Sequence, residues 1–126
     1  MTHSDNPLAR DGHVSYLEIP ATDPIASARF YEAVFGWQIG RHKPGQPSFD
    51  DRSGNLIGRF IPDRVPSREP GFVPFIYVAR IDDTVARIVR NGGEIAKPVY
   101  PEGDLFVATF RDPAGNVVGV WQFGPR

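Results

Sequence analysis

The sequence predicts an α+β protein built from two tandem βαβββ modules, and two observations lead to this fold class. First, each half of the 126-residue chain has the same order of elements: a strand, a helix, a glycine that ends the helix, and three further strands. Second, residues 54–60 (GNLIGRF) match residues 115–121 (GNVVGVW) at a constant offset of about 61 residues. Element order and motif agree, which favours an internal duplication over a chance match.

The first module begins with a strand over residues 14–19, which Pro20 ends. Asp23 then supplies an N-cap acceptor, and Pro24 occupies the first helical position, where its missing N–H costs nothing. The helix ends at Gly36, a residue suited to the left-handed conformation of a helix C-terminus. Three further strands are expected over residues 37–39, 47–50 and 55–61.

The second module repeats this order. A strand over residues 75–78 precedes Asp82 and Asp83, which are expected to cap a helix. Val85, Ile88 and Val89 follow with the spacing of one helical face, and Gly92 and Gly93 end the helix. Three strands are expected over residues 94–97, 105–111 and 116–123. We therefore expect a flexible tail over 1–12 and a single domain over 13–126, with module one at about 13–61, a linker at about 62–72 and module two at about 73–124.

Composition excludes several classes of function. The chain has no cysteine, which rules out disulfides, thiolate metal sites and thiol catalysis. The net charge is −1, so the chain has no basic field to attract nucleic acid or an acidic membrane surface. No apolar run reaches the ~18 residues of a membrane span, and residues 1–12 lack the apolar stretch of a signal peptide. We expect a cytoplasmic protein with no nucleic-acid or membrane partner.

The order and spacing of several short motifs resemble the vicinal oxygen chelate superfamily, which includes glyoxalase I, bleomycin-resistance proteins and extradiol dioxygenases. The resemblance covers roughly residues 14–123. It implies that the eight strands form an open, cup-shaped mixed sheet with the helices outside, and that the protein is a homodimer. The motifs that carry the resemblance are Glu18-Ile19-Pro20, Asp23-Pro24, Phe30-Tyr31, Val34-Phe35-Gly36-Trp37, Asn91-Gly92-Gly93 and Asp112-Pro113-Ala114-Gly115-Asn116.

Metal-dependent members of this family hold their ion with His or Glu at four inward-facing positions. The resemblance places these positions at Tyr16, Gly58, Val73 and Gly119, with Val73 the least secure because Pro74 can shift the register. Glycine and valine have no donor atom and neutral tyrosine is a poor ligand, so we expect no metal and no cofactor. The chain has three histidines, His3, His13 and His42, and an alternative metal site that uses His13 stays open.

Alternate residues of a strand share one face, and this periodicity defines a candidate pocket. Replacement of bulky metal ligands by glycine leaves room beside several aromatic rings, which favours a largely apolar pocket. The alternative is that these rings pack as ordinary core. The candidate ligand-binding residues are Tyr16, Glu18, Gly58, Phe60, Phe75, Tyr77, Gly119 and Trp121.

Glu18 is the candidate catalytic residue, because a carboxylate on an aromatic wall is partly desolvated and moves towards the range of a general base. Alternatively, Glu18 pairs with Arg59 or Arg111 or anchors a ligand. The leading hypothesis is a metal-free homodimeric binder of a small apolar or aromatic molecule. The alternatives are a metal-free enzyme that uses Glu18 or Tyr16, a metal-dependent lyase, isomerase or dioxygenase, and a regulatory domain with a vestigial cup.

Overall fold

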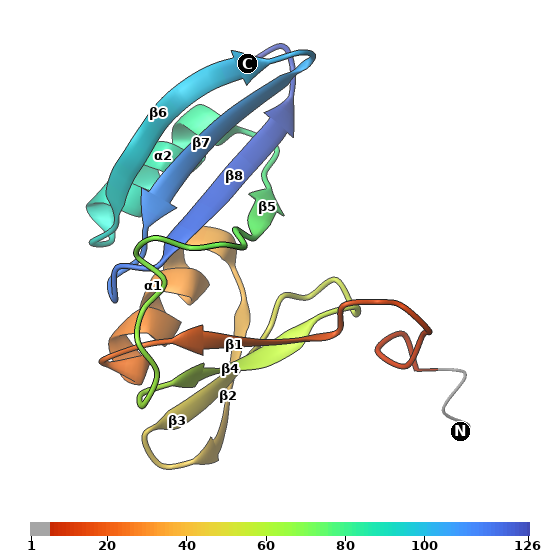
Figure 1. The fold of residues 1–126 in the computed structure, drawn as a ribbon, viewed down its shortest axis with the longest axis vertical. Coiled ribbons are helices and arrows are strands. Elements are labelled where there is room, and N and C mark those ends of the chain that lie inside the picture. Colours follow the sequence, from red (N-terminus) through yellow and green to blue (C-terminus); the bar gives the residue numbers. More distant parts are fainter. Residues whose placement is uncertain (1–5) are drawn as a thin grey trace.

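The computed structural model describes residues 6–126, and for residues 41–43 it describes the backbone alone. These described residues form ten elements of secondary structure, which fall into two modules with the same order (Figure 1). Module one contains β1 (Tyr16–Pro20), α1 (Pro24–Phe35), β2 (Gln38–Lys43), β3 (Gln46–Asp50) and β4 (Ile57–Ile61). Module two contains β5 (Phe75–Tyr77), α2 (Ile81–Arg90), β6 (Glu94–Glu102), β7 (Leu105–Arg111) and β8 (Val117–Phe123).

The two modules also share one sheet topology. Module one forms a four-stranded sheet of order β1-β4-β3-β2, and module two forms a second sheet of order β5-β8-β7-β6. In each sheet the first and last strands of the module pair in parallel, and the remaining pairs are antiparallel. The α+β class and the tandem βαβββ modules are therefore confirmed. The eight strands found within residues 6–126 lie in two separate sheets, with β1 and β5 each at the edge of its own sheet.

Helix α1 begins and ends where the sequence predicts. The Asp23 side chain accepts a hydrogen bond from the backbone N–H of Ala26, and Pro24 is the first helical residue. Gly36 ends the helix in the left-handed conformation, with φ of 72°. Buried α1 side chains pack on both sheets, since the Tyr31 ring lies 5.7 Å from Phe60 and the Phe30 ring lies 5.8 Å from Phe110. This shared core fixes the modules relative to each other.

Module two differs from the sequence prediction at two places. Helix α2 begins at Ile81 after Arg80, so Asp82 and Asp83 lie in its first turn and do not cap it. Acidic residues in the first turn still oppose the positive end of the helix dipole. Strand β6 extends to Glu102, well beyond the predicted end at residue 97. None of the helices in the described part of the chain is long and apolar enough to cross a membrane.

The facing of β4 is the main correction. Gly58 pairs with Leu17 and Phe60 pairs with Ile19, whereas Tyr16 and Glu18 pair with Ile57 and Arg59. Paired residues share a face, so Gly58 and Phe60 lie on the helix-covered face while Tyr16 and Glu18 lie on the open face. Phe60 is only 1% exposed and packs in the core. The prediction that these four residues share one face is wrong.

A longer turn explains this error. The turn between β3 and β4 closes through a hydrogen bond from Asp51 N to Leu56 O, and the matching turn between β7 and β8 closes through one from Asp112 N to Asn116 O. Module one thus has one more residue between the strands, after the matching Gly-Asn pair. A shift of one residue reverses the face of every side chain that follows. The structural counterpart of Gly119 is therefore Arg59.

Candidate functional site

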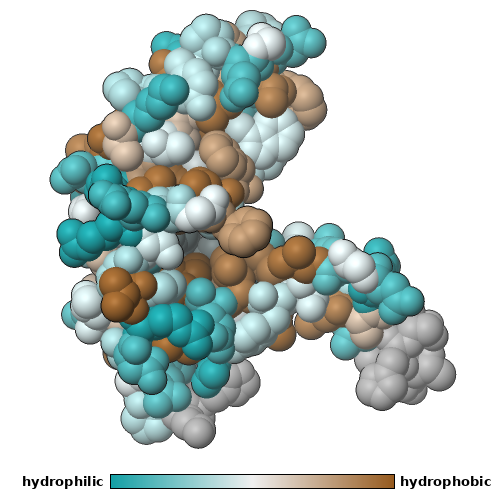
Figure 2. Space-filling model, in the orientation of Figure 1, coloured by the Kyte–Doolittle hydropathy of each residue, from teal (hydrophilic) through white to brown (hydrophobic). Residues whose placement is uncertain are grey.

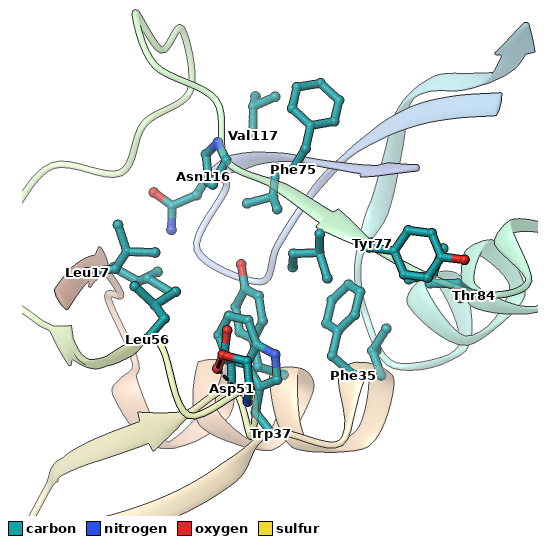
Figure 3. A pocket seen from close by; sticks show the side chains of 18 of the residues that line it. Leu17, Phe35, Trp37, Asp51, Leu56, Phe75, Tyr77, Thr84, Asn116 and Val117 are labelled. Carbon is teal, nitrogen blue, oxygen red and sulfur yellow. Dashed lines mark hydrogen bonds between the residues drawn. The ribbon is translucent and has the colours of Figure 1, made fainter. Parts of the chain in front are cut away.

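An open cleft of about 820 Å³ lies between the two modules. Its volume is within the range of small-molecule sites. Apolar residues line the hollow between the upper and lower parts of the molecule (Figure 2). In the close-up, Phe35 and Trp37 rise from α1 and the segment after it, whereas the rings of Phe75 and Tyr77, on β5, point away from the centre of the cleft (Figure 3). Leu17 and Leu56 close the side formed by module one.

Three of the predicted site residues, Glu18, Phe75 and Tyr77, line this cleft. Gly119 and Trp121 pair with Phe75 and Tyr77, so they share the open face of module two, as predicted. Tyr16 and Gly58 border a smaller depression of about 320 Å³ on module one. Phe60 takes part in neither cavity. The cleft thus takes in three of the eight predicted residues, while Gly119 and Trp121 lie on the open face of the inner strand β8.

The open face of module two carries a cluster of aromatic rings. Tyr77 and Trp121 meet edge to face with ring centres 5.0 Å apart, and Phe123 meets Trp121 in the same way at 5.1 Å. The ring of Phe75 lies directly over Gly119, in the space that a side chain there would fill. Phe75 is 48% exposed and Tyr77 is 53% exposed, although both are large apolar groups. Exposed rings grouped in this way are a surface for stacking.

Two guanidinium groups surround the Glu18 carboxylate on the open face of module one. Arg59 Nη2 lies 3.6 Å from Glu18 Oε2, and Arg64 pairs with the other carboxylate oxygen. Arg59 Nε also donates a hydrogen bond of 2.8 Å to Tyr16 Oη, and this contact is the main cause that raises the pKa of Arg59. Glu18 thus has the ion pair with Arg59 that the sequence left open. Arg111 instead donates to the backbone oxygen of Arg68.

The residues at the four family metal positions do not fit a metal ion. After the correction for the longer turn, these positions hold Tyr16, Arg59, Val73 and Gly119. Arginine repels a cation, valine and glycine offer no side-chain donor, and the Tyr16 hydroxyl accepts from Arg59. Outside residues 1–5 and the side chains of 41–43, no three His, Cys, Asp or Glu side chains form a group that could hold a metal.

The histidines do not change this conclusion within the described residues. The His13 ring lies 2.8 Å from the backbone oxygen of Asn55, so one ring nitrogen already has a partner. Among the described side chains, His13 belongs to no group of three His, Cys, Asp or Glu that could form the alternative metal site. His3 and the side chain of His42 lie outside the described residues.

A buried polar network closes the cleft at the module junction. The carboxylate of Asp112 accepts hydrogen bonds from Tyr31 Oη and Asn116 Nδ2, both at 2.9 Å, and from the three backbone N–H groups of residues 114–116. Burial raises the pKa of Asp112, although these hydrogen bonds oppose the shift. Burial and the adjacent carboxylate raise the pKa of Tyr31 well above its usual value, so its hydroxyl stays a donor.

The sequence of this chain matches the model of a known protein family. Residues 12–120 match the family model described as the Glyoxalase/Bleomycin resistance protein/Dioxygenase superfamily. The chain belongs to this superfamily.

Superfamily relatives of this chain include a protein named "Putative glyoxylase CFP32" from Mycobacterium bovis and Mycobacterium tuberculosis. It is 29% identical over 122 residues, which cover 90% of this chain and 46% of the relative. The chain thus spans about half the length of these curated relatives. A "Glyoxylase-like domain-containing protein" from Didymella fabae is 29% identical over 114 residues, covering 83% of this chain and 89% of the relative.

Solved structures of the superfamily share the fold. A glyoxalase/bleomycin resistance protein/dioxygenase family enzyme from Burkholderia phytofirmans has a TM-score of 0.74 and 20% identity, and the match covers 90% of this chain and all of that one. TnmS3, an antibiotic binding protein from Streptomyces sp. CB03234, has a TM-score of 0.68 and 23% identity, with 90% and 97% of the two chains covered. At these identities the likeness shows the fold alone.

Several cleft residues were not found by sequence reasoning. Phe72 is 97% exposed at the rim, and Arg64 belongs to the Glu18 cluster, yet both lie in the irregular segment between the modules. Thr84 and Arg87 enter the cleft from α2, where Arg87 donates to the backbone oxygen of Val34. The segment between β4 and β5 has no periodic pattern, so only its composition, with the isolated aromatic residue Phe72, carried any signal there.

Proposed function

We propose that this chain is a metal-free binding protein for a small, largely apolar or aromatic molecule, held in the cleft between the modules. The observation that carries the proposal is the open cleft of about 820 Å³, which is lined mainly by apolar residues and bordered by the exposed residues Phe72, Phe75 and Tyr77. Each fully buried aromatic side chain gains about 1.5–3 kcal/mol, so exposed rings on a concave surface favour an apolar occupant. TnmS3, which has the same fold, is described as an antibiotic binding protein.

The donor set supports binding without a metal. Lewis-acid catalysis needs carboxylate, imidazole or thiolate ligands around the ion. Tyr16, Arg59, Val73 and Gly119 supply none of these at the family positions. In this proposal the protein therefore holds its ligand by stacking and apolar contact, with no cofactor.

We also propose that the protein is a cytoplasmic homodimer. β1 and β5 each lie at the edge of a sheet, and edge strands expose backbone groups that favour pairing with another chain. Tyr16 on β1 and Phe75 on β5 are both large, exposed apolar groups beside these edges. A second copy of this chain is the partner that we propose covers them. Size-exclusion chromatography with light scattering tests this assembly directly.

An enzyme is the second candidate, and it is favoured by the relatives named as a glyoxylase and as a glyoxylase-like domain-containing protein. In a metal-free enzyme of this kind, Glu18 would exchange a proton with the substrate. The guanidinium groups of Arg59 and Arg64 pair with both carboxylate oxygens of Glu18, which is the environment of an anchor more than of a base. Turnover that Glu18→Gln abolishes, with ligand affinity unchanged, would favour the enzyme.

The binding proposal is tested with the neutral fluorescent probe N-phenyl-1-naphthylamine. We expect saturable binding to the wild type, and about tenfold weaker binding in Phe75→Ala and Tyr77→Ala, because each change removes a stacking surface. Val89→Ala is the matched control, since Val89 is exposed on α2 and does not line the cleft. Equal binding by all four proteins, or none by the wild type, would overturn the proposal.

A further inference from the structure

Arg87, on α2, brings a guanidinium group to the wall of the cleft, where its side chain is half-buried. Its Nε donates to the backbone oxygen of Val34 at 3.4 Å, and its Nη2 donates to Thr84 Oγ1 at 3.3 Å. Both acceptors are neutral, and no carboxylate outside residues 1–5 and the side chains of 41–43 forms an ion pair with Arg87. A charge that is partly removed from water and lacks an ionic partner favours a ligand of opposite sign.

The two hydrogen bonds of Arg87 place its guanidinium group beside the apolar wall of the same cleft. Val34 and Phe35 lie in the last turn of α1, and both line the cleft next to the Arg87 contact. Figure 3 shows the Phe35 ring rising into the cleft, with Thr84 on the α2 side of it. Thr84 also donates to the backbone oxygen of Arg80 at 3.0 Å, which fixes its oxygen where it accepts from Arg87. The guanidinium group and the apolar wall are therefore parts of one site.

The other charged side chains that line the cleft do not neutralise Arg87. Within the described residues they are Glu18, Asp51, Arg80 and Asp83. Glu18 pairs with arginines outside the lining, and Asp83, one turn before Arg87, is exposed and pairs with Arg80 at 3.9 Å. Asp51 keeps its negative charge, but it lies on the opposite side of Phe35 from Thr84 (Figure 3). The free negative and positive charges thus lie at different ends of the cleft.

The guanidinium group of Arg87 keeps donors for a ligand. A guanidinium carries five N–H groups in one plane, and the two hydrogen bonds of Arg87 leave three of them. These donors match the oxygens of a carboxylate or another oxyanion. We infer that the ligand of the cleft is an organic acid, with an apolar body that lies against Phe35 and an anionic group that binds Arg87. This inference rests on the proposed binding function and specifies its ligand class.

Two fluorescent probes with one ring skeleton test the inference. 1-Anilinonaphthalene-8-sulfonate carries a sulfonate, and N-phenyl-1-naphthylamine is its neutral counterpart. We expect the sulfonate probe to bind the wild type about tenfold more tightly than the neutral probe, because only the sulfonate forms charge-assisted hydrogen bonds with Arg87. Arg87→Gln should reduce this ratio of affinities to about one, because the charge is lost. Arg87→Lys keeps the charge without the planar donors, so it should retain only part of the ratio.

Arg90→Gln is the matched control, since Arg90 is an exposed arginine in the last turn of α2 that does not line the cleft. It should keep the ratio of the wild type. Equal affinity of the wild type for the two probes, or an undiminished ratio in Arg87→Gln, would overturn the inference and leave the binding function standing. A ratio that falls in Arg64→Gln and not in Arg87→Gln would place the anion beside Glu18 and would also overturn it.

Failure of both probes to bind would overturn the binding function itself. Melting temperatures show whether each variant folds. If Arg87→Gln does not fold, an undiminished ratio in Arg87→Lys overturns the inference in its place.

Discussion

Tyr31 on α1 donates a hydrogen bond of 2.9 Å to the carboxylate of Asp112, which lies 81 residues further along the chain in module two. Both side chains are buried, at 1% and 4% exposed. The contact joins the helix of one module to the last hairpin of the other. Because the cleft lies between the modules, this hydrogen bond helps to set the distance between its two walls.

We expect Tyr31→Phe to destabilise the protein by about 1–3 kcal/mol at pH 7, since a buried carboxylate loses a donor. The hydroxyl stabilises the charged form of Asp112, so its loss raises the pKa of Asp112 further. The cost of the substitution is therefore full above that pKa and becomes smaller as the pH falls through it. Urea unfolding of both proteins at pH 7 and about pH 4 measures this. An equal cost at the two pH values would contradict the account.

Asn116→Ala should cost at least about 2 kcal/mol, because the buried Asn116 side chain bonds three groups at the junction, one of them the buried Asp112 carboxylate. Its amide nitrogen donates to Pro20 O at 2.6 Å and to Asp112 Oδ2 at 2.9 Å, and its oxygen accepts from Ser67 N at 2.7 Å. Asn91→Ala is the control, since the exposed Asn91 side chain donates to Arg87 O alone. Thermal unfolding compares the two variants, and a similar loss in both would argue against the junction.

Gly58 in β4 and Gly119 in β8 should respond differently to substitution by alanine. At Gly58 the new Cβ would overlap the backbone oxygen of Leu17 and the ring of Phe49, both in the packed interior. We expect Gly58→Ala to lose about 3 kcal/mol or more. At Gly119 the Cβ would meet the half-exposed Phe75 ring, which can turn away, so the cost should stay below about 1 kcal/mol.

Gly119→Ala, the substitution with the smaller cost in stability, should have the clearer effect on ligand binding. Displacement of the Phe75 ring changes the cleft wall, so Gly119→Ala should weaken binding of N-phenyl-1-naphthylamine while it leaves the melting temperature nearly unchanged. Fluorescence titration and thermal unfolding of the same samples separate the two effects. Unchanged probe affinity in Gly119→Ala would show that Phe75 does not contact the probe.

Local sequence signals predicted the helices, the strands and the repeat, because each depends on residues close in the chain. Helix α1 begins after Asp23 and ends before Gly36, as expected, because helix capping depends only on the residues at the two ends of the helix. The predicted facing of β4 was wrong because a single extra residue in the turn before it places Gly58 and Phe60 on the opposite face of the sheet. Residues 54–60 still match residues 115–121 in sequence, and this match concealed the extra residue.

The candidate site depends on contacts that no local pattern records. The cleft exists because α1 packs on both modules and the Tyr31–Asp112 pair fixes their separation. Arg64 reaches Glu18 from a segment without periodicity, so its role emerged only with the fold. The aromatic face of β8 could be predicted, because its strand alternates buried Val118 and Val120 with Gly119 and Trp121.

The most direct test of the central claim is the affinity of the protein for N-phenyl-1-naphthylamine with and without metal. The protein is treated with EDTA, desalted and titrated with the probe, alone and after addition of one equivalent of Ni²⁺, Zn²⁺, Mn²⁺ or Fe²⁺. The account predicts the same saturable binding in every sample. Binding that appears only when a metal is present would contradict it.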